Sequence, residues 1–389
     1  MSCFVEAAAS GGTGVVGVQQ QVALALGVEG ESASLGALVA ALGTRQPPLP
    51  EKDADAIVVS LLHLMSSSGS ASLVEPLMQA IDTLRNSLSP DALFALAVNV
   101  YNAPDLAQGQ TRVEVFTQAA KYAQQGGSAN LRLLCRQLPE VLSTSLGWGL
   151  STGGRRQLLS ACADVAAAAQ EFTDELSYLL EAIKLVDSPA DASSPAVRAL
   201  TVRWICQAIR LSTFLEYDRI KRVEALAALS GTPDSWAEDL LQLFFNADLK
   251  GLPAFVAKTS GALEANGLTE EILSSELRVF CLCNLCSRKG VLGYAEVADL
   301  LDVSEEEVER WVVKTVRSGS IQVKMNQPQK QIVVKSALPF NFAEDQWSKL
   351  SLRLRDWRKR LEGLSTSVSA SLTSTPAAPS AALAASSSS

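Results

Sequence analysis

Apolar residues recur at helical spacing along most of the chain, in segments of about 12 to 18 residues. The breaks between these segments contain Gly, Pro, Asp or Ser, which often interrupt helices. No run in this region alternates apolar and polar residues as a strand does. The pattern predicts helices at 53–65, 71–88, 90–101, 110–123, 130–142, 155–169, 174–186, 195–211, 217–229, 235–247 and 252–265.

These predicted helices begin about 20 residues apart, so a pair of helices recurs about every 40 residues. A single pair cannot cover its own apolar face, and stacking of successive pairs buries it. We therefore expect a mainly α protein in which residues 51–268 form an α-solenoid of helical-repeat pairs. The helix pairs repeat in length and spacing but not in their amino-acid sequence. A compact irregular bundle therefore remains the alternative. Residues 1–50 predict a Gly/Ala-rich leader with one or two helices and a Pro-rich linker.

The pattern changes after residue 268 and predicts a winged helix over residues 269–338. Helices are expected at 270–288, 293–303 and 304–317, followed by two strands joined by the turn NQPQ. Ser304 and Glu307 have the spacing of a capping box at the start of the third helix. Residues expected on inward faces are Val308, Trp311, Val312, Thr315 and Val316 on that helix, Ile321, Val323 and Met325 on the first strand, and Ile332 and Val334 on the second.

Residues 339–364 predict a final helix with a narrow apolar seam. Trp347, Leu350, Leu354, Trp357, Leu361 and Leu364 follow one another in steps of three and four. This spacing is typical of a coiled coil or a helical bundle. The seam packs either in a bundle with helices from other subunits, which we favour, or against the chain's own winged helix. Residues 365–389 carry no charge and no periodicity, and we expect them to be disordered.

The charge distribution bears on whether the winged helix reads nucleic acid. The chain has 33 basic and 41 acidic residues, a net charge of -8, so contact with nucleic acid requires a local basic patch. The third helix instead starts with Glu305, Glu306 and Glu307, at the end that usually meets bases. DNA binding is therefore not expected, although a nucleic-acid-binding winged helix remains an alternative. Candidates for contact with RNA or an acidic partner are Lys324, Lys330, Arg353, Arg355, Arg358, Lys359 and Arg360.

Residues that could carry chemistry do not converge in the sequence. Cys281, Cys283 and Cys286 are close together, but on a helix Cys281 points roughly opposite to Cys283, which excludes a shared zinc. His63 is the only histidine and lies in an apolar helix. The GTGVVG motif at 12–17 lacks the second strand that a dinucleotide site requires. We therefore predict no catalytic residue, cofactor or metal, and no enzymatic activity. Scattered cysteines, no long apolar run and no targeting signal predict a cytoplasmic location without a membrane span.

The order of helical repeats, winged helix and terminal helix resembles the PCI family. Four stretches carry the resemblance, and the last two are the more specific. They are VEALAAL at 223–229, DLLQLFFNADLKGLPAFV at 239–256, VERWVVKTVRSGSIQVKMNQPQKQIVV at 308–334 and FAEDQWSKLSLRLRDWRKRL at 342–361. The resemblance extends over roughly residues 90–364, and it does not include the first 50 residues or the Ser-rich tail.

PCI domains are scaffolds of the proteasome lid, the COP9 signalosome and eukaryotic translation initiation factor 3, and this chain most resembles the last group. The resemblance implies a non-catalytic scaffold subunit that acts in translation initiation. Its expected partners are other PCI and MPN subunits and, through the complex, the small ribosomal subunit. Its partner contacts are expected from the final-helix seam and from Ile321, Val323, Ile332 and Val334. A signalosome or lid subunit is the alternative.

Overall fold

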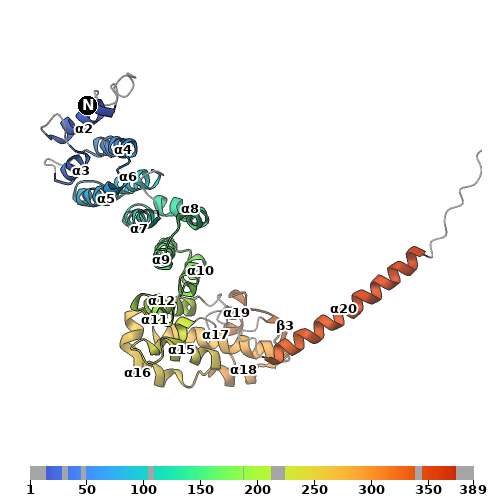
Figure 1. Ribbon diagram of the computed structural model, residues 1–389. Coiled ribbons are helices and arrows are strands. Elements are labelled where there is room, and N and C mark those ends of the chain that lie inside the picture. The colour runs from blue at the N-terminus through green and yellow to red at the C-terminus, as the bar shows by residue number, and fades with distance from the viewer. Residues whose placement is uncertain are drawn as a thin grey trace, which may run out of the picture. The chain divides into compact units, whose positions relative to one another are not determined.

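The computed structural model describes residues 15–28, 34–44, 50–103, 109–186, 188–211, 224–337 and 344–373 (Figure 1). The chain divides into two units, at residues 1–338 and 339–389. Helices of the first unit up to residue 265 are α2 Val15–Leu26, α3 Leu35–Thr44, α4 Glu51–Ser68, α5 Val74–Thr83, α6 Pro90–Tyr101, α7 Gly109–Gln125, α8 Ser128–Ser145, α9 Thr152–Ala168, α10 Phe172–Lys184, α11 Pro189–Ala192, α12 Pro195–Arg210, α14 Glu224–Ala227, α15 Ser235–Asn246 and α16 Leu252–Ala265.

These helices match the predicted segments closely wherever the structure describes them. The predicted helix at 217–229 lies mostly outside the described residues, which hold only α14 there. The Gly-rich motif at 12–17 also falls largely outside them, as do residues 45–49 of the Pro-rich stretch.

Local signals at the helix ends explain why the boundaries agree. Ser89 Oγ accepts a hydrogen bond from the backbone N–H of Ala92 at 3.2 Å, and Ser151 Oγ accepts one from Gly154 at the same distance. Such caps satisfy amides that have no partner in the first turn. At the other end of α4, Gly69 adopts a φ of 66°, a left-handed conformation that glycine adopts without a steric penalty.

Most helices of the repeat region contact a neighbour along the chain, and several also contact the helix after next. Helix α6 contacts α7 and α4, α7 contacts α9, and α10 contacts both α9 and α12. This nearest-neighbour packing is what an α-solenoid requires, and it confirms the predicted helical repeats.

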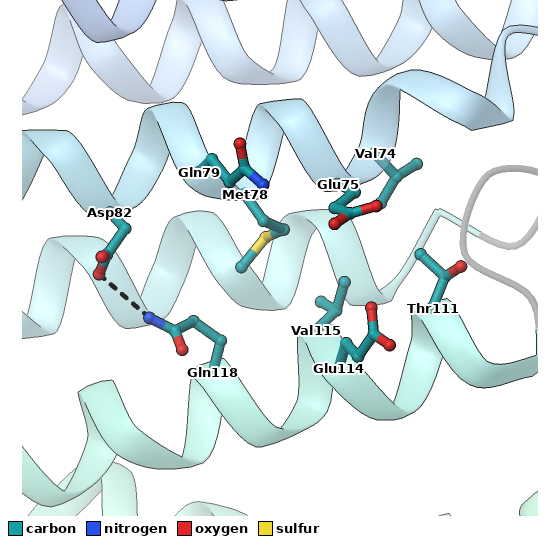
Figure 2. Close-up of a pocket in the computed structure, with 9 residues that line it drawn as sticks. All are labelled: Val74, Glu75, Met78, Gln79, Asp82, Thr111, Glu114, Val115 and Gln118. Atoms are coloured by element: carbon teal, nitrogen blue, oxygen red, sulfur yellow. Dashed lines mark hydrogen bonds between the residues drawn. The ribbon is translucent and has the colours of Figure 1, made fainter. Parts of the chain in front are cut away.

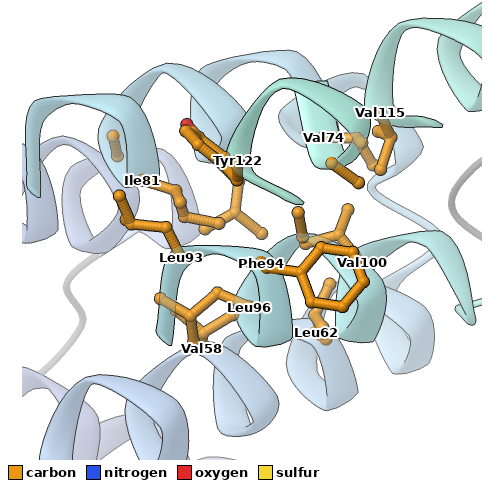
Figure 3. Close-up of a cluster of buried hydrophobic side chains, with 14 of the residues drawn as sticks. Val58, Leu62, Val74, Ile81, Leu93, Phe94, Leu96, Val100, Val115 and Tyr122 are labelled. Atoms are coloured by element: carbon orange, nitrogen blue, oxygen red, sulfur yellow. The ribbon is translucent and has the colours of Figure 1, made fainter. Parts of the chain in front are cut away.

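Stacked apolar faces form one core that extends from α2 to α9. Figure 3 shows Val58 of α4, Ile81 of α5, Leu93 of α6 and Tyr122 of α7 in this cluster. Helices α2 and α3, from the segment predicted as a leader, also bury side chains in it, among them Leu38.

A buried tryptophan joins the later repeats. Trp204 of α12 is 0% exposed, and its Nε1 donates a hydrogen bond to the Leu176 carbonyl of α10 at 3.1 Å. The neighbouring Arg203 pairs with Glu175 at 2.8 Å and also with Asp164 of α9. Helices α9, α10 and α12 are therefore linked by two adjacent residues of α12.

The winged helix follows directly. Its helices are α17 Glu270–Arg288, α18 Tyr294–Leu301 and α19 Val308–Arg317, and its strands are β1 Val291–Gly293, β2 Ile321–Asn326 and β3 Gln331–Ala337. The sheet is antiparallel in the order β1-β3-β2, with Leu292 opposite Ile332. The predicted two-stranded wing is therefore corrected to three strands. The missed strand has three residues, too few to show a period of two.

Two details of α19 also differ from the prediction. The backbone N–H of Glu307 donates to the Ser304 carbonyl at 3.0 Å, and α19 has no side-chain cap, so the predicted capping box is absent. Residues 305–307 form a turn ahead of the helix, which moves the true start to Val308. Val316, expected on the inner face, is 40% exposed, whereas Val312 and Thr315 are buried.

The second unit contains α20, Glu344–Thr373, a helix of 30 residues. The prediction ended this helix at residue 364 and assigned disorder from residue 365. In the structure the helix continues to Thr373, so both of these boundaries were placed too early. Extending an existing helix costs far less than nucleating one, and small residues such as Ala and Ser tolerate it. Val368 also follows Leu364 by four residues and continues the apolar spacing. Residues 374–389 lie outside the described residues.

Within the described ranges, no helix combines the length and the apolar character that a bilayer crossing requires.

Candidate protein-protein interface

A stripe of large apolar side chains runs along α20. We call it the α20 seam, and its members are Trp347, Leu350, Leu354, Trp357, Leu361, Leu364 and Val368. Exposed fractions range from 37% at Leu350 to 65% at Leu361. A large apolar side chain left in water forgoes roughly 1.5–3 kcal/mol of burial free energy. An apolar stripe with this spacing is typical of a helix that packs against other helices.

Basic residues of α20 fall into two groups. Arg353, Arg358 and Arg360 lie on the helix surface directly beside the seam, whereas Arg355 and Lys359 are farther round the helix. The Nε of Arg358 donates to the Glu362 carboxylate one turn later at 2.8 Å. All of these basic side chains are exposed, so their charges are available to a partner.

The four wing residues predicted to contact a partner do not share one environment. Ile321 and Ile332 are 2% and 0% exposed, and Val323 and Val334 are half-buried. Because β3 lies against α17, Ile332 belongs to the layer that packs on the helices. The two isoleucines are therefore core residues and form no part of an accessible surface. A partner contact through Val323 and Val334 stays a prediction.

The opposite face of the sheet carries apolar residues that the sequence interpretation missed. Val291 is 52% exposed and Val333 is 37% exposed, and the two are directly opposite each other in the β1–β3 pairing. Lys324 is opposite Val333 on β2, so all three share one face. The alternation of faces along β3 could have revealed this surface, because Val333 directly follows the buried Ile332 and therefore points to the opposite face.

The acidic turn before α19 is engaged within the winged helix. Lys330 Nζ lies 2.7 Å from Glu305 Oε2, and this carboxylate raises the pKa of Lys330. Glu309 accepts hydrogen bonds from the Tyr294 hydroxyl at 3.0 Å and from Gln327 Nε2 at 3.1 Å. These contacts hold the wing turn against α18 and α19. Of the two wing lysines proposed for RNA or acidic partners, Lys330 already has a carboxylate partner.

Trp311 of α19 lies at the centre of a second polar cluster. Its ring is 5.3 Å from the guanidinium of Arg278 and 5.5 Å from Lys314 Nζ, distances suited to cation–π attraction. Arg278 Nε donates to the Leu301 carbonyl at 3.0 Å, and Lys314 pairs with Glu276 at 3.0 Å. These contacts join the three helices α17, α18 and α19 to one another.

The repeat region contains a groove between α5 and α7 (Figure 2). Met78 and Val115 line it together with the carboxylates of Glu75 and Glu114. Near one end, Gln118 Nε2 donates to Asp82 Oδ1 at 3.1 Å. Across the described residues, no group of three His, Cys, Asp or Glu side chains is arranged to hold a metal ion.

The cysteines are packing residues where the structure describes them. Burial raises the pKa of Cys162 and Cys283 to about 12 and that of Cys206, Cys281 and Cys286 to about 11. Cys281 Sγ donates to the Ala247 carbonyl at 3.4 Å. A thiol with a raised pKa is a poor nucleophile and a poor metal ligand. His63 is exposed on α4.

We expect these five buried thiols to react with a thiol reagent at pH 8 only after the protein unfolds. The pKa of each thiol is higher in the folded protein than the value of about 8.5 in the unfolded chain. At a pH between these two values, the thiols of the folded protein therefore stay protonated. The contribution of these protonated thiols to the free energy of unfolding is therefore fully present below about pH 8.5. It is lost as the pH rises toward 11 to 12. Timed labelling with and without urea measures this. Rapid native labelling of all five would contradict the burial.

Comparison with known proteins finds a match to a family model in the second half of the chain. Residues 235–336 match the family model described as PCI domain, a range that includes α15, α16 and the winged helix. Residues 235–336, which follow the helical repeats, are therefore similar to a PCI domain.

Curated relatives extend the match beyond the PCI domain. The chain is 27% identical over 330 residues to eukaryotic translation initiation factor 3 subunit M of Aspergillus clavatus, covering 81% of this chain and 69% of the relative. It is 26% identical over 310 residues to the subunit M of Phaeosphaeria nodorum, covering 78% and 69%. With that of Emericella nidulans it is 31% identical over 243 residues, covering 59% and 52%. The predicted resemblance to the PCI family and to initiation factor 3 is thereby confirmed.

Proposed function

We propose that the chain is a non-catalytic scaffold subunit of eukaryotic translation initiation factor 3 and acts in the initiation of protein synthesis in the cytoplasm. The observation that carries the proposal is the combination of a PCI domain with similarity to subunit M across most of the chain. The exposed α20 seam supports it, because an apolar stripe of this length suits a permanent assembly. The relatives' shared name favours initiation factor 3 over the signalosome and the proteasome lid.

Each part of the chain has a separate task in this scaffold. The repeats set the distance and direction of the PCI domain through nearest-neighbour packing. The outer sheet face, with Val291 and Val333, and the half-buried Val323 and Val334 contact the winged helix of a neighbouring PCI subunit. The α20 seam enters a bundle with helices of other PCI and MPN subunits. The small ribosomal subunit is reached through the complex.

A direct role in reading DNA does not fit the arrangement of charges. Residues 270–336 contain ten acidic and nine basic residues, so this domain has little net attraction for phosphates. The acidic turn stands where a recognition helix would meet bases, and Glu305 and Glu309 hold the wing. Contact with RNA is confined in this proposal to Lys324 and to the basic side chains of α20.

The proposed function is tested by affinity purification of the tagged chain from its own cells, with quantitative mass spectrometry. We expect initiation factor 3 subunits in stoichiometric amounts and small-subunit ribosomal proteins at lower recovery. Nuclease treatment before elution serves as the control, since protein-mediated partners remain bound after RNA is removed. Recovery of signalosome or proteasome-lid subunits instead would refute the assignment.

A further inference from the structure

We infer that the α20 seam pairs with a helix of a different chain whose seam is flanked by acidic residues, and that it does not pair with a second copy of itself. This inference rests on the proposed function, since it specifies the partner in the bundle. The observation behind it is the charge of the residues on either side of the seam.

The seam defines a heptad register. Steps of three and four place Trp347, Leu354, Leu361 and Val368 at a positions and Leu350, Trp357 and Leu364 at d positions. Positions e and g then flank the seam and face a partner helix. From residue 351 to 367 they are occupied by Ser351, Arg353, Arg358, Arg360, Ser365 and Ser367. Each charged member of this set is therefore an arginine.

The acidic residues of the same stretch lie on the outer face. Asp356 occupies a c position and Glu362 a b position. Glu362 pairs with Arg358 on the same helix, which offsets part of that charge. Among the described residues, Arg353 and Arg360 have no carboxylate within ion-pair distance. Both are exposed and occupy g positions, so two uncompensated positive charges line one side of the seam.

Between residues 351 and 367, a second copy of α20 offers these arginines no carboxylate at an e or g position in either orientation. In a parallel pair, g of one helix meets e of the next heptad, which sets Arg353 against Arg358 of the other copy. In an antiparallel pair, g meets g and e meets e, so arginine again faces arginine. Like charges at such positions repel, and their repulsion determines which helices pair. The seam therefore favours association through its apolar residues but opposes self-association through its flanks.

A partner helix with Asp or Glu at its e and g positions reverses each of these contacts. Arg353 and Arg360 then form ion pairs across the interface while the apolar seam is buried. A partner helix with basic residues at these positions would meet repulsion in place of attraction. Because exposed ion pairs are of modest strength, its affinity for α20 should be about tenfold lower than that of the acidic helix. Apolar burial thus supplies the affinity, and the arginines select the partner.

The test uses the full chain and two designed helical peptides that have the same apolar a and d residues. One peptide carries Glu at every e and g position, and the other carries Lys there. We expect the Glu peptide to bind about tenfold more tightly or better by fluorescence anisotropy at low salt. This preference should shrink at 1 M salt, where charges are screened within about 3 Å. Sedimentation at micromolar concentration should show a monomer.

Two variants with equal charge change separate the flank from the outer face. Arg353→Glu with Arg360→Glu should abolish or invert the peptide preference, whereas Arg355→Glu with Lys359→Glu, at b and f positions, should leave it within about twofold of the unchanged protein. Far-ultraviolet circular dichroism checks that both variants keep their helix content.

Equal binding of the two peptides, binding of neither peptide, self-association through α20, or equal effects of the two variants would overturn the inference. The proposed function can fail separately, because it depends on which subunits co-purify with the chain. If the chain co-purifies with initiation factor 3 but does not distinguish the peptides, only the acidic-partner inference is lost.

Discussion

Replacing Trp347 and Trp357 together by alanine should release the chain from its complex while its helical repeats stay folded. Both side chains are more than half exposed, at 57% and 63%, so the isolated chain gains little stability from them. In the assembly they become buried anchors, and removing such an anchor commonly costs about 2 kcal/mol or more. The pair should weaken association by about a hundredfold or more. Co-purification of the tagged variant measures the loss, and thermal unfolding of the purified chain measures the unchanged fold.

Leu352→Ala is the matched control for this experiment. Leu352 lies on the same helix at an f position and is 59% exposed, but it is outside the seam. The complex should therefore tolerate its loss. If the helix instead packed on the chain's own winged helix, the double tryptophan variant would lower the unfolding temperature of the purified chain and leave its partners bound. That result would exclude the bundle.

Most helices were predictable because one local rule governs them. In α6 and α12, a serine cap precedes a proline at the first helical position, and apolar residues then follow at helical spacing. Each cue acts within a few residues of the chain. Packing of these helices into an α-solenoid also followed, because each pair leaves an uncovered apolar face that the next pair buries.

Features that depend on distant residues were missed. Val291–Gly293 becomes a strand only because β3 pairs with it from about 40 residues away. Ser304 and Glu307 were expected to form a capping box at the start of α19, but a backbone turn forms there instead, in which the Glu307 N–H donates to the Ser304 carbonyl. The end of α20 was placed too early because the Ser-rich composition was taken as a sign of disorder.

The interface was predictable in part. Spacing alone identified the seam, because steps of three and four persist through a helix with no competing pattern. Spacing could not distinguish a core position from a docking position in the wing, since Ile332 and Val333 are adjacent and both apolar. Which of them is buried depends on the face that α17 covers, and only the folded sheet reveals this.

Trp204→Ala should have the opposite effect to the tryptophan pair of α20, destabilising the repeats themselves. Trp204 is fully buried between α12 and α10, and truncating a buried tryptophan to alanine costs about 3–5 kcal/mol through lost burial and the cavity left behind. The urea midpoint, followed by far-ultraviolet circular dichroism, should fall by about 1 M or more. In cells the variant should be scarce because the unfolded chain is degraded.

Trp204→Phe distinguishes the two parts of that cost. Phenylalanine keeps most of the buried volume but loses the hydrogen bond from Trp204 Nε1 to the Leu176 carbonyl, a loss of about 0.5–1.5 kcal/mol. Its midpoint should therefore lie between those of the unchanged protein and the alanine variant. The fraction of Trp204→Phe that stays folded should still enter the complex, because its α20 seam is intact, whereas the Trp347 and Trp357 double variant stays folded and unassembled. If all three variants lost stability and partners in proportion, the seam would be acting as part of the core and not as a docking surface.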